Sequence, residues 1–190
     1  DLMRKNEILV GLIGWGTVGT GVSKILVEKN ASVETGLGAK ISLAKIADLD
    51  LKKSRGVKVG KQSLTNDAYK IINDPEIDIV IELIGGVEPA KTFICEAIKK
   101  GKQIVTANKA LLAVHGDEIF SLAKKHGVDV YFEASVGGGI PIIRVLREAF
   151  VGDPIKSIYS IINGTANYIL TEMTQKKGDF KSVLKDAQKL

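Results

Sequence analysis

The sequence predicts an α/β fold in which helices cover both faces of a doubly wound, parallel β-sheet. Short runs of β-branched and apolar residues alternate along the chain with longer segments whose apolar residues recur every three or four positions. This alternation is typical of parallel strands joined by crossover helices. A glycine-rich turn also joins the first predicted strand to the first predicted helix, as in many folds of this class.

Five segments are predicted to be strands because they are short, rich in Ile and Val, and bounded by glycine or polar residues. Strands that are buried on both faces of a parallel sheet are almost continuously apolar, and these segments follow that rule. The predicted strands are Ile8–Ile13, Ile41–Ala47, Ile77–Leu83, Gln103–Thr106 and Val128–Glu133.

The segments between these strands are predicted to be helices because their apolar residues share one helical face. Thr65, Asn66 and Asp67 offer oxygen atoms that could cap one of them. Gly101 and Gly127 stand where two others should end. The predicted helices are Val18–Glu28, Ala68–Ile72, Pro89–Lys100 and Asp117–Lys125.

The pattern changes after Glu133, where a glycine cluster replaces the regular alternation. We therefore predict two domains, residues 1–135 and residues 136–190, the second being the start of an α+β domain. Its last helix has no stop signal before Leu190, so we expect this domain to be incomplete. Its predicted elements are a helix over Ile140–Phe150, a strand over Ile155–Ile162, and helices over Ala166–Gln175 and Asp179–Leu190.

The composition argues against nucleic-acid and membrane partners. The net charge is +5, but the basic residues come mostly in pairs near predicted helix ends, where cations suit the helix dipole. Aromatic residues make up only 5% of the chain, so few side chains could stack on bases. No apolar run approaches the roughly 20 residues that a membrane-spanning helix needs. The first residues do not resemble a secretory signal, and the single cysteine, Cys95, cannot form an internal disulfide, so we expect a cytoplasmic protein.

A glycine-rich motif, G-x-G-x-x-G, lies between the first predicted strand and the first predicted helix. This flanking strand and helix make the short pattern specific for a Rossmann-like dinucleotide site. The first glycine permits a tight turn, the second admits the pyrophosphate, and the third allows helix and strand to pack closely. The alternative is a turn that serves packing alone. The residues expected to contact the cofactor are Gly14, Trp15, Gly16, Thr17, Val18 and Gly19.

The residue after the second strand should distinguish the two nicotinamide cofactors. An acidic residue there would bind the ribose hydroxyl of NAD, whereas a basic residue would favour the 2′-phosphate of NADP. Asp48 occupies this position, and Lys52, Lys53 and Arg55 follow closely. The sequence leaves both NAD and NADP open, and we expect NAD to be accepted alongside NADP.

Two further segments follow predicted strands at the edge where open α/β sheets bind ligands. One contains Ile84, Gly85 and Gly86, whose glycines would let the backbone approach the nicotinamide half of the cofactor; a plain turn is the alternative. The other ends in Lys109, which directly follows a buried strand and would face the ligand crevice. A charged group in that position is a candidate for catalysis.

Five segments, taken together, resemble the signature segments of the homoserine dehydrogenase family in order and spacing. They are GLIGWGTVG, ELIGGVEPA, VTANKALLA, FEASVGGGIPII and INGTANYIL. The resemblance covers nearly the whole chain. It implies an NAD- or NADP-dependent oxidoreductase that interconverts homoserine and aspartate 4-semialdehyde, on the route to threonine, methionine and isoleucine. It also implies a homodimer whose subunits pair through the second, catalytic and dimerisation domain.

The resemblance assigns roles to individual residues. Lys109 matches a lysine that lies near both cofactor and substrate and is implicated in proton transfer; a surface ammonium is the alternative. Asn163, Gly164 and Thr165 match a segment beside the substrate pocket. For these three residues the alternative is a turn followed by a helix cap.

A cation site is also implied by the resemblance. Glu133 and the backbone carbonyls of Val136, Gly138 and Ile140 match a monovalent-cation site that usually holds sodium. A carboxylate with several carbonyl oxygens suits a hard cation. The alternative is that Glu133 caps the helix that follows.

The resemblance also implies what this chain lacks. In the family, a substrate-binding glutamate and a catalytic aspartate and lysine follow the point at which this sequence ends, Leu190. We therefore expect cofactor binding without full activity. Two other classes stay open: a dehydrogenase with a nucleophilic cysteine, against which Cys95 lies in the middle of a predicted helix, and a nucleotide-binding module without catalysis.

Overall fold

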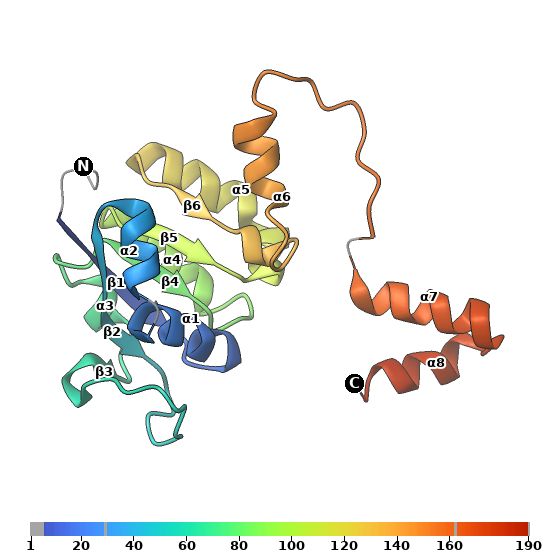
Figure 1. The fold of residues 1–190 in the computed structure, drawn as a ribbon, viewed down its shortest axis with the longest axis horizontal. Coiled ribbons are helices and arrows are strands. Elements are labelled where there is room, and N and C mark those ends of the chain that lie inside the picture. Colours follow the sequence, from blue (N-terminus) through green and yellow to red (C-terminus); the bar gives the residue numbers. More distant parts are fainter. Residues whose placement is uncertain (1–5, 29, 162, 190) are drawn as a thin grey trace. The chain divides into compact units, whose positions relative to one another are not determined.

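The computed structural model describes residues 6–28, 30–161 and 163–189, and the chain divides into two compact units (Figure 1). The first unit extends to Ile143, and the second begins at Arg144. The first unit holds the sheet and its helices, and the second holds a helical hairpin.

The first unit contains a parallel sheet with the strand order β3-β2-β1-β4-β5-β6. The strand order reverses direction between β1 and β4, which is the defining feature of a doubly wound, Rossmann-like sheet. The predicted fold class is therefore confirmed. The strands are β1 (Glu7–Ile13), β2 (Lys40–Ala47), β3 (Leu64–Thr65), β4 (Ile79–Glu82), β5 (Gln103–Thr106) and β6 (Val130–Tyr131).

All five predicted strands are present, and β3 is an addition. β3 contains only two residues, which is too short for any periodicity to be visible in the sequence. It joins the edge of the sheet through parallel pairing of Leu64 with Ile46 and of Thr65 with Ala47.

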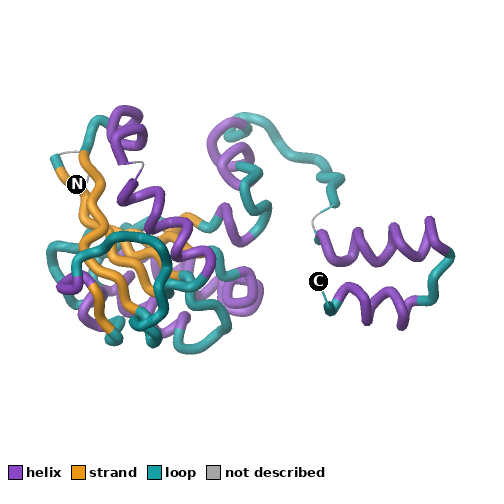
Figure 2. The backbone as a smooth tube through the Cα atoms, turned by 60° about the horizontal axis from the view of Figure 1, so that its bottom comes forward, coloured by secondary structure: helices purple, strands orange, loops and turns teal. Residues whose placement is uncertain are grey.

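Helices lie on both sides of this sheet (Figures 1 and 2). α5 begins earlier than predicted because the side chain of Asn108 accepts a hydrogen bond from Leu111 N and so caps the helix before Lys109. α2 was not predicted. Among the described residues, no helix has the length and apolar character needed to cross a membrane. The helices of this unit are α1 (Thr17–Glu28), α2 (Asn30–Leu37), α3 (Tyr69–Ile72), α4 (Ala90–Lys99) and α5 (Lys109–His126).

The main core lies between the sheet and helices α3, α4 and α5. Ile71, Ile94 and Ile119 are fully buried there against strand residues such as Val80 and Ile104. Burial of each of these side chains contributes about 1.5–3 kcal/mol to folding. This packing holds the strands rigidly, which the loops at their ends require.

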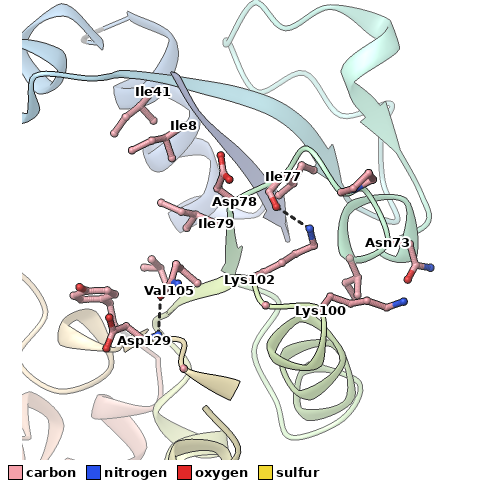
Figure 3. Close-up of a pocket in the computed structure, with 16 residues that line it drawn as sticks. Ile8, Ile41, Asn73, Ile77, Asp78, Ile79, Lys100, Lys102, Val105 and Asp129 are labelled. Atoms are coloured by element: carbon pink, nitrogen blue, oxygen red, sulfur yellow. Dashed lines mark hydrogen bonds between the residues drawn. The ribbon is translucent and has the colours of Figure 1, made fainter. Parts of the chain in front are cut away.

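The opposite face of the sheet is less completely covered. Its apolar residues Ile8, Ile41, Ile79 and Val105 lie along one hollow of about 990 Å³ (Figure 3). At its end, the ammonium of Lys102 donates to the backbone carbonyl of Ile77, 2.7 Å away. This hollow lies toward the amino ends of the strands, away from the edge at which the predicted site residues gather.

The second unit is built around two helices, α7 (Gly164–Lys176) and α8 (Phe180–Ala187), which confirm two predicted helices. Each begins with a capping side chain: Asn163 accepts from Ala166 N, and Asp179 accepts from Lys181 N and Ser182 N. The predicted helix over Ile140–Phe150 appears as a short turn, α6 (Ile142–Arg144), followed by a π-helical turn over Val145–Ala149.

The strand predicted over Ile155–Ile162 is wrong for the residues that the structure describes. Residues 155–161 form no regular secondary structure, and Ile162 lies outside the described residues. The alternating apolar pattern identified side chains suited to a sheet, but a strand also needs a neighbouring strand to pair with its backbone. Ile158, Tyr159 and Ile161 are instead largely exposed in this chain.

Candidate active site

The carboxyl ends of β1, β2 and β4 meet at a cleft of about 470 Å³. It lies at the point where the strand order reverses, which is where open α/β sheets bind their ligands. Five of the predicted cofactor-contacting residues line this cleft. They are Gly14, Gly16, Asp48, Ile84 and Gly85.

The three glycines of the G-x-G-x-x-G motif are required for different reasons. Gly14 has a φ of 99°, and a Cβ atom there would lie 2.7 Å from the backbone carbon of Leu83. A Cβ atom on Gly19 would lie 2.1 Å from the carbonyl oxygen of Gly14. At Gly16, by contrast, a Cβ atom would meet nothing within 4 Å. The fold thus requires the first and third glycines, whereas the second keeps space open for a ligand.

The start of α1 faces this open space. Thr17 is the first residue of the helix, and Gly16 accepts the first intrahelical hydrogen bond, from Thr20 N at 2.8 Å. The amides of the first helical turn, at Thr17, Val18 and Gly19, have no acceptor within the helix itself. Together with the helix dipole, these amides make the loop suitable for an anionic group such as a pyrophosphate.

Asp48 links the end of β2 to the glycine loop. One carboxyl oxygen accepts from Trp15 N at 2.6 Å, and the other accepts from Arg55 Nη2 at 3.1 Å. The guanidinium of Arg55 also lies 4.6 Å from the centre of the Trp15 ring. The indole N–H of Trp15 donates to the buried hydroxyl of Ser23, 2.9 Å away. Trp15 therefore anchors the loop in the core, a role that the sequence did not suggest.

Glu82 is a buried carboxylate that sequence reasoning passed over. It is the last residue of β4 and is 0% exposed. Its Oε1 atom accepts from Ile84 N at 2.9 Å and from Gly85 N at 3.3 Å, and its Oε2 atom accepts from the Thr106 hydroxyl at 2.7 Å. Gly85 and the next residue, Gly86, have φ values of 74° and 73°, which favour glycine. The signal available in the sequence was a charged residue ending an otherwise apolar strand.

Lys109 lies at the same edge of the sheet, exposed, as the first residue of α5. The preceding residue, Asn108, fixes its position in two ways. The side-chain nitrogen of Asn108 donates to the backbone carbonyl of Gly86 at 2.7 Å. Its side-chain oxygen accepts from Leu111 N and so caps α5. The lysine is thereby tied to the glycine turn after β4, although it is not among the residues that line the cleft.

Glu133 opens a 3₁₀ turn after β6, and its Oε1 atom accepts from Ile143 N at 2.8 Å. The carbonyl of Ile140, another predicted cation ligand, accepts from Ile142 N at 2.8 Å. No group of three or more His, Cys, Asp or Glu residues is gathered for a metal within the described part of the chain. Val136 and Gly138, the other two predicted ligands, lie in the same loop and would contribute backbone carbonyls.

The predicted substrate-contacting residues Asn163, Gly164 and Thr165 lie in the second unit, at the start of α7. Asn163 uses its side-chain oxygen as the helix cap, 2.8 Å from Ala166 N. Its backbone is extended, and Gly164 and Thr165 form the first helical turn.

Cys95 does not have the properties of a catalytic nucleophile. It lies within α4, and burial raises the pKa of its thiol. A raised pKa disfavours the reactive thiolate at neutral pH. The cleft residues do not include it. This counts against a dehydrogenase that works through a covalent thioester.

Comparison with protein-family models gives two matches. The model described as the NAD-binding domain of homoserine dehydrogenase matches residues 14–133. The model described as homoserine dehydrogenase matches residues 141–190. Together they cover nearly all of the cleft residues, the segment containing Lys109 and the whole of the second unit.

Curated proteins with similar sequences carry the same name. The homoserine dehydrogenase of Bacillus subtilis (strain 168) is 46% identical over 183 residues, which are 96% of this chain and 42% of that protein. The homoserine dehydrogenase of Neisseria gonorrhoeae is 45% identical over 181 residues, which are 95% of this chain and 41% of that protein. The chain thus spans less than half the length of these relatives.

Solved structures agree with this result. A crystal structure of a homoserine dehydrogenase from Thiobacillus denitrificans matches with a TM-score of 0.86 and 47% identity, covering 96% of this chain and 42% of that chain. A hyperthermophilic archaeal homoserine dehydrogenase in complex with NADPH matches with a TM-score of 0.80 and 26% identity, covering 96% of this chain and 61% of that chain.

The contrast between the glycines gives a direct test of the cleft. In Gly16→Ala the new methyl group meets no protein atom, so thermal unfolding should be almost unchanged. The methyl group would instead occupy ligand space, and we expect the affinity for a dinucleotide, measured by calorimetry, to fall at least about tenfold.

Gly21→Ala is the matched control, because Gly21 lies in the second turn of α1 and also has open space around it. It should stabilise the helix by about 0.5–1 kcal/mol and leave the affinity unchanged. Wild-type affinity in Gly16→Ala would show that this loop does not hold the ligand.

Proposed function

The chain belongs to the homoserine dehydrogenase family, and we propose that it provides the cofactor-binding part of an NAD(P)-dependent oxidoreductase that interconverts L-homoserine and L-aspartate 4-semialdehyde. This reaction serves threonine, methionine and isoleucine biosynthesis. Residues 1–135 would form the dinucleotide-binding domain, and residues 136–190 would begin the substrate-binding and catalytic domain. The observation that carries this proposal is the glycine-lined cleft beside a turn that is hydrogen-bonded to the segment bearing Lys109.

The chemistry of the cleft residues fits a nicotinamide dinucleotide. The amides at the start of α1 would hold the pyrophosphate beside Gly16. Asp48 stands at the end of β2, where a ribose hydroxyl is bound in folds of this type. The turn over Ile84, Gly85 and Gly86 would contact the nicotinamide half. When bound, the cofactor supplies the acceptor or donor of a hydride.

Lys109 would act at the oxygen atom of the substrate. As the carbinol carbon loses a hydride to the cofactor, the hydroxyl group must lose its proton and becomes a carbonyl. An amine or ammonium at this oxygen can move that proton and stabilise the charge that develops. Asn163, Gly164 and Thr165 would help to bind the substrate, on the strength of the family resemblance.

Substitution of Lys109 tests this function. We expect the full-length protein to reduce NAD or NADP when homoserine is added, and Lys109→Ala to lower turnover by about a hundredfold or more. The affinity for the cofactor alone should stay within about twofold of the wild-type value, since the proposed role of Lys109 lies in proton transfer.

Lys124→Ala provides the control, since Lys124 lies in the last turn of the same helix, far along from Lys109. Its turnover should equal that of the wild type. Near-normal turnover in Lys109→Ala would contradict the catalytic role. Cofactor binding with no homoserine-dependent reduction would instead favour a nucleotide-binding module without catalysis.

We propose that the site accepts both NAD and NADP. Asp48 suits the free ribose hydroxyls of NAD, but the neighbouring guanidinium of Arg55 could pair with the 2′-phosphate of NADP. Arg55 lies against Asp48 and Trp15, so its guanidinium stands beside the carboxylate at which the ribose would bind.

Calorimetric titration with NAD and with NADP tests whether the site accepts both cofactors. We expect dissociation constants for NAD and NADP within about tenfold of each other. Arg55→Ala should lower the affinity for NADP at least about fivefold more than the affinity for NAD, because only the 2′-phosphate of NADP loses a charged partner. Lys52→Ala, in the same loop, should leave the ratio unchanged. A strict preference for NADP in the wild type would contradict dual use.

Two further features are proposed from the family resemblance. Glu133 and the backbone carbonyls of Val136, Gly138 and Ile140 would bind sodium, because all four ligands are hard oxygen atoms. The carboxylate of Glu133 accepts one hydrogen bond from Ile143 N and keeps further lone pairs for a cation. Sodium chloride should then stabilise the protein more than choline chloride in thermal unfolding, and equal effects would oppose this site.

The protein is also proposed to form a homodimer. Ile158, Tyr159 and Ile161 are exposed in a segment without regular secondary structure, and pairing with a second copy would remove their apolar surface from water. Light scattering should give a dimer mass for the full-length protein, whereas a monomer would contradict this assembly.

A further inference from the structure

We infer that Glu82 is a positioning residue, which sets the place of the nicotinamide-binding turn relative to Lys109. This inference rests on the proposed function, because it concerns the same cleft. It goes beyond that function in assigning a role to a carboxylate that would touch neither cofactor nor substrate.

Glu82 has an unusual environment for a charged group. It is completely buried, and all its hydrogen bonds come from neutral donors: two backbone amides and one hydroxyl group. No lysine or arginine pairs with it within the part of the chain that the structure describes. Burying a charge without a countercharge is costly, even with good hydrogen bonds. An apolar residue would suit the core of β4 better, so core packing alone does not explain this carboxylate.

The hydrogen bonds of Glu82 belong to a closed ring. Its Oε2 atom accepts from the Thr106 hydroxyl, whose oxygen accepts from Asn108 N at 3.0 Å. The side chain of Asn108 donates to the carbonyl of Gly86. The preceding residue, Gly85, donates its backbone N–H to the Oε1 atom of Glu82 and so closes the ring. The ring therefore joins the end of β4, the glycine turn, the end of β5 and the residue before Lys109.

This ring determines what the turn can present to a ligand. The amides of Ile84 and Gly85 point at Glu82, so they are not available to bind phosphate. The residues themselves line the cleft, and Gly85 has open space where a side chain would be. At Gly85 the turn thus offers backbone without a side chain, which suits close approach of the uncharged edge of a nicotinamide group. Without Glu82, the hydrogen bond from Asn108 to the carbonyl of Gly86 would still link the turn to α5, but the turn would lose the buried carboxylate that holds its two amides.

Glu82→Gln tests this role, because glutamine has nearly the same size but can no longer accept on both sides. We expect the affinity for the complete dinucleotide to fall about tenfold in calorimetry. The affinity for ADP-ribose, which lacks the nicotinamide ring, should stay within about twofold. A general loosening of the domain would weaken both ligands equally. Turnover of the full-length protein should fall at least about tenfold.

Thr106→Val is the second variant, since valine keeps the shape and suits a strand while breaking the same ring. It should lower the affinity for the dinucleotide about threefold and leave the affinity for ADP-ribose unchanged. If Glu82→Gln does not unfold cooperatively, this variant decides the question. Asp78→Asn is the matched control, because the Asp78 carboxylate accepts from Leu9 N at the opposite end of the β4 segment. It should change neither affinity.

The outcomes separate the two proposals. Wild-type protein that binds neither ligand contradicts the proposed function. Suppose instead that the wild-type protein binds both ligands. If the ring variants then keep their affinity for both ligands, or lose affinity for both equally, the positioning role of Glu82 is contradicted. A selective loss of the dinucleotide in the ring variants supports it.

Discussion

The pairing of β1 with two parallel neighbours is the constraint on which the site depends. At the end of β1, Ile13 stands beside Ala47 of β2 on one side and Glu82 of β4 on the other. Because all three strands run in the same direction, the residues that follow them emerge at one edge. This register brings together the glycine loop, Asp48 and the turn after β4, although they are far apart in the sequence.

Close packing of backbone against backbone then shapes the cleft. The absence of a side chain at Gly14 lets the loop after β1 lie against the turn after β4, and the absence of one at Gly19 brings α1 against the loop. Below this backbone surface, Glu82, Thr106 and Asn108 satisfy the polar groups of the turns. A rigid polar layer of this kind is what pre-organised binding requires, because movement of a turn by about 1 Å can cost much of the rate.

Much of this arrangement could be predicted from the sequence. Runs of Ile and Val located five of the strands, and the glycine motif located the cleft, because strand ends and glycine turns are local features. Long-range pairing was harder to predict. Glu82 looked like an interruption in an apolar run, since its partner Thr106 is distant in sequence. The apolar alternation at 155–161 suggested a strand, but no strand pairs with this segment among the residues that the structure describes.

The proposed function depends on a reduced dinucleotide entering the cleft beside Trp15. This residue is the only tryptophan of the chain, and it is buried within the glycine loop. Its fluorescence is therefore a local probe of the site. Titration with reduced NAD or NADP should quench the emission of Trp15 in a saturable manner and transfer energy to the bound nicotinamide. Folded protein whose tryptophan emission shows no saturable change with either reduced cofactor would contradict dinucleotide binding in this cleft.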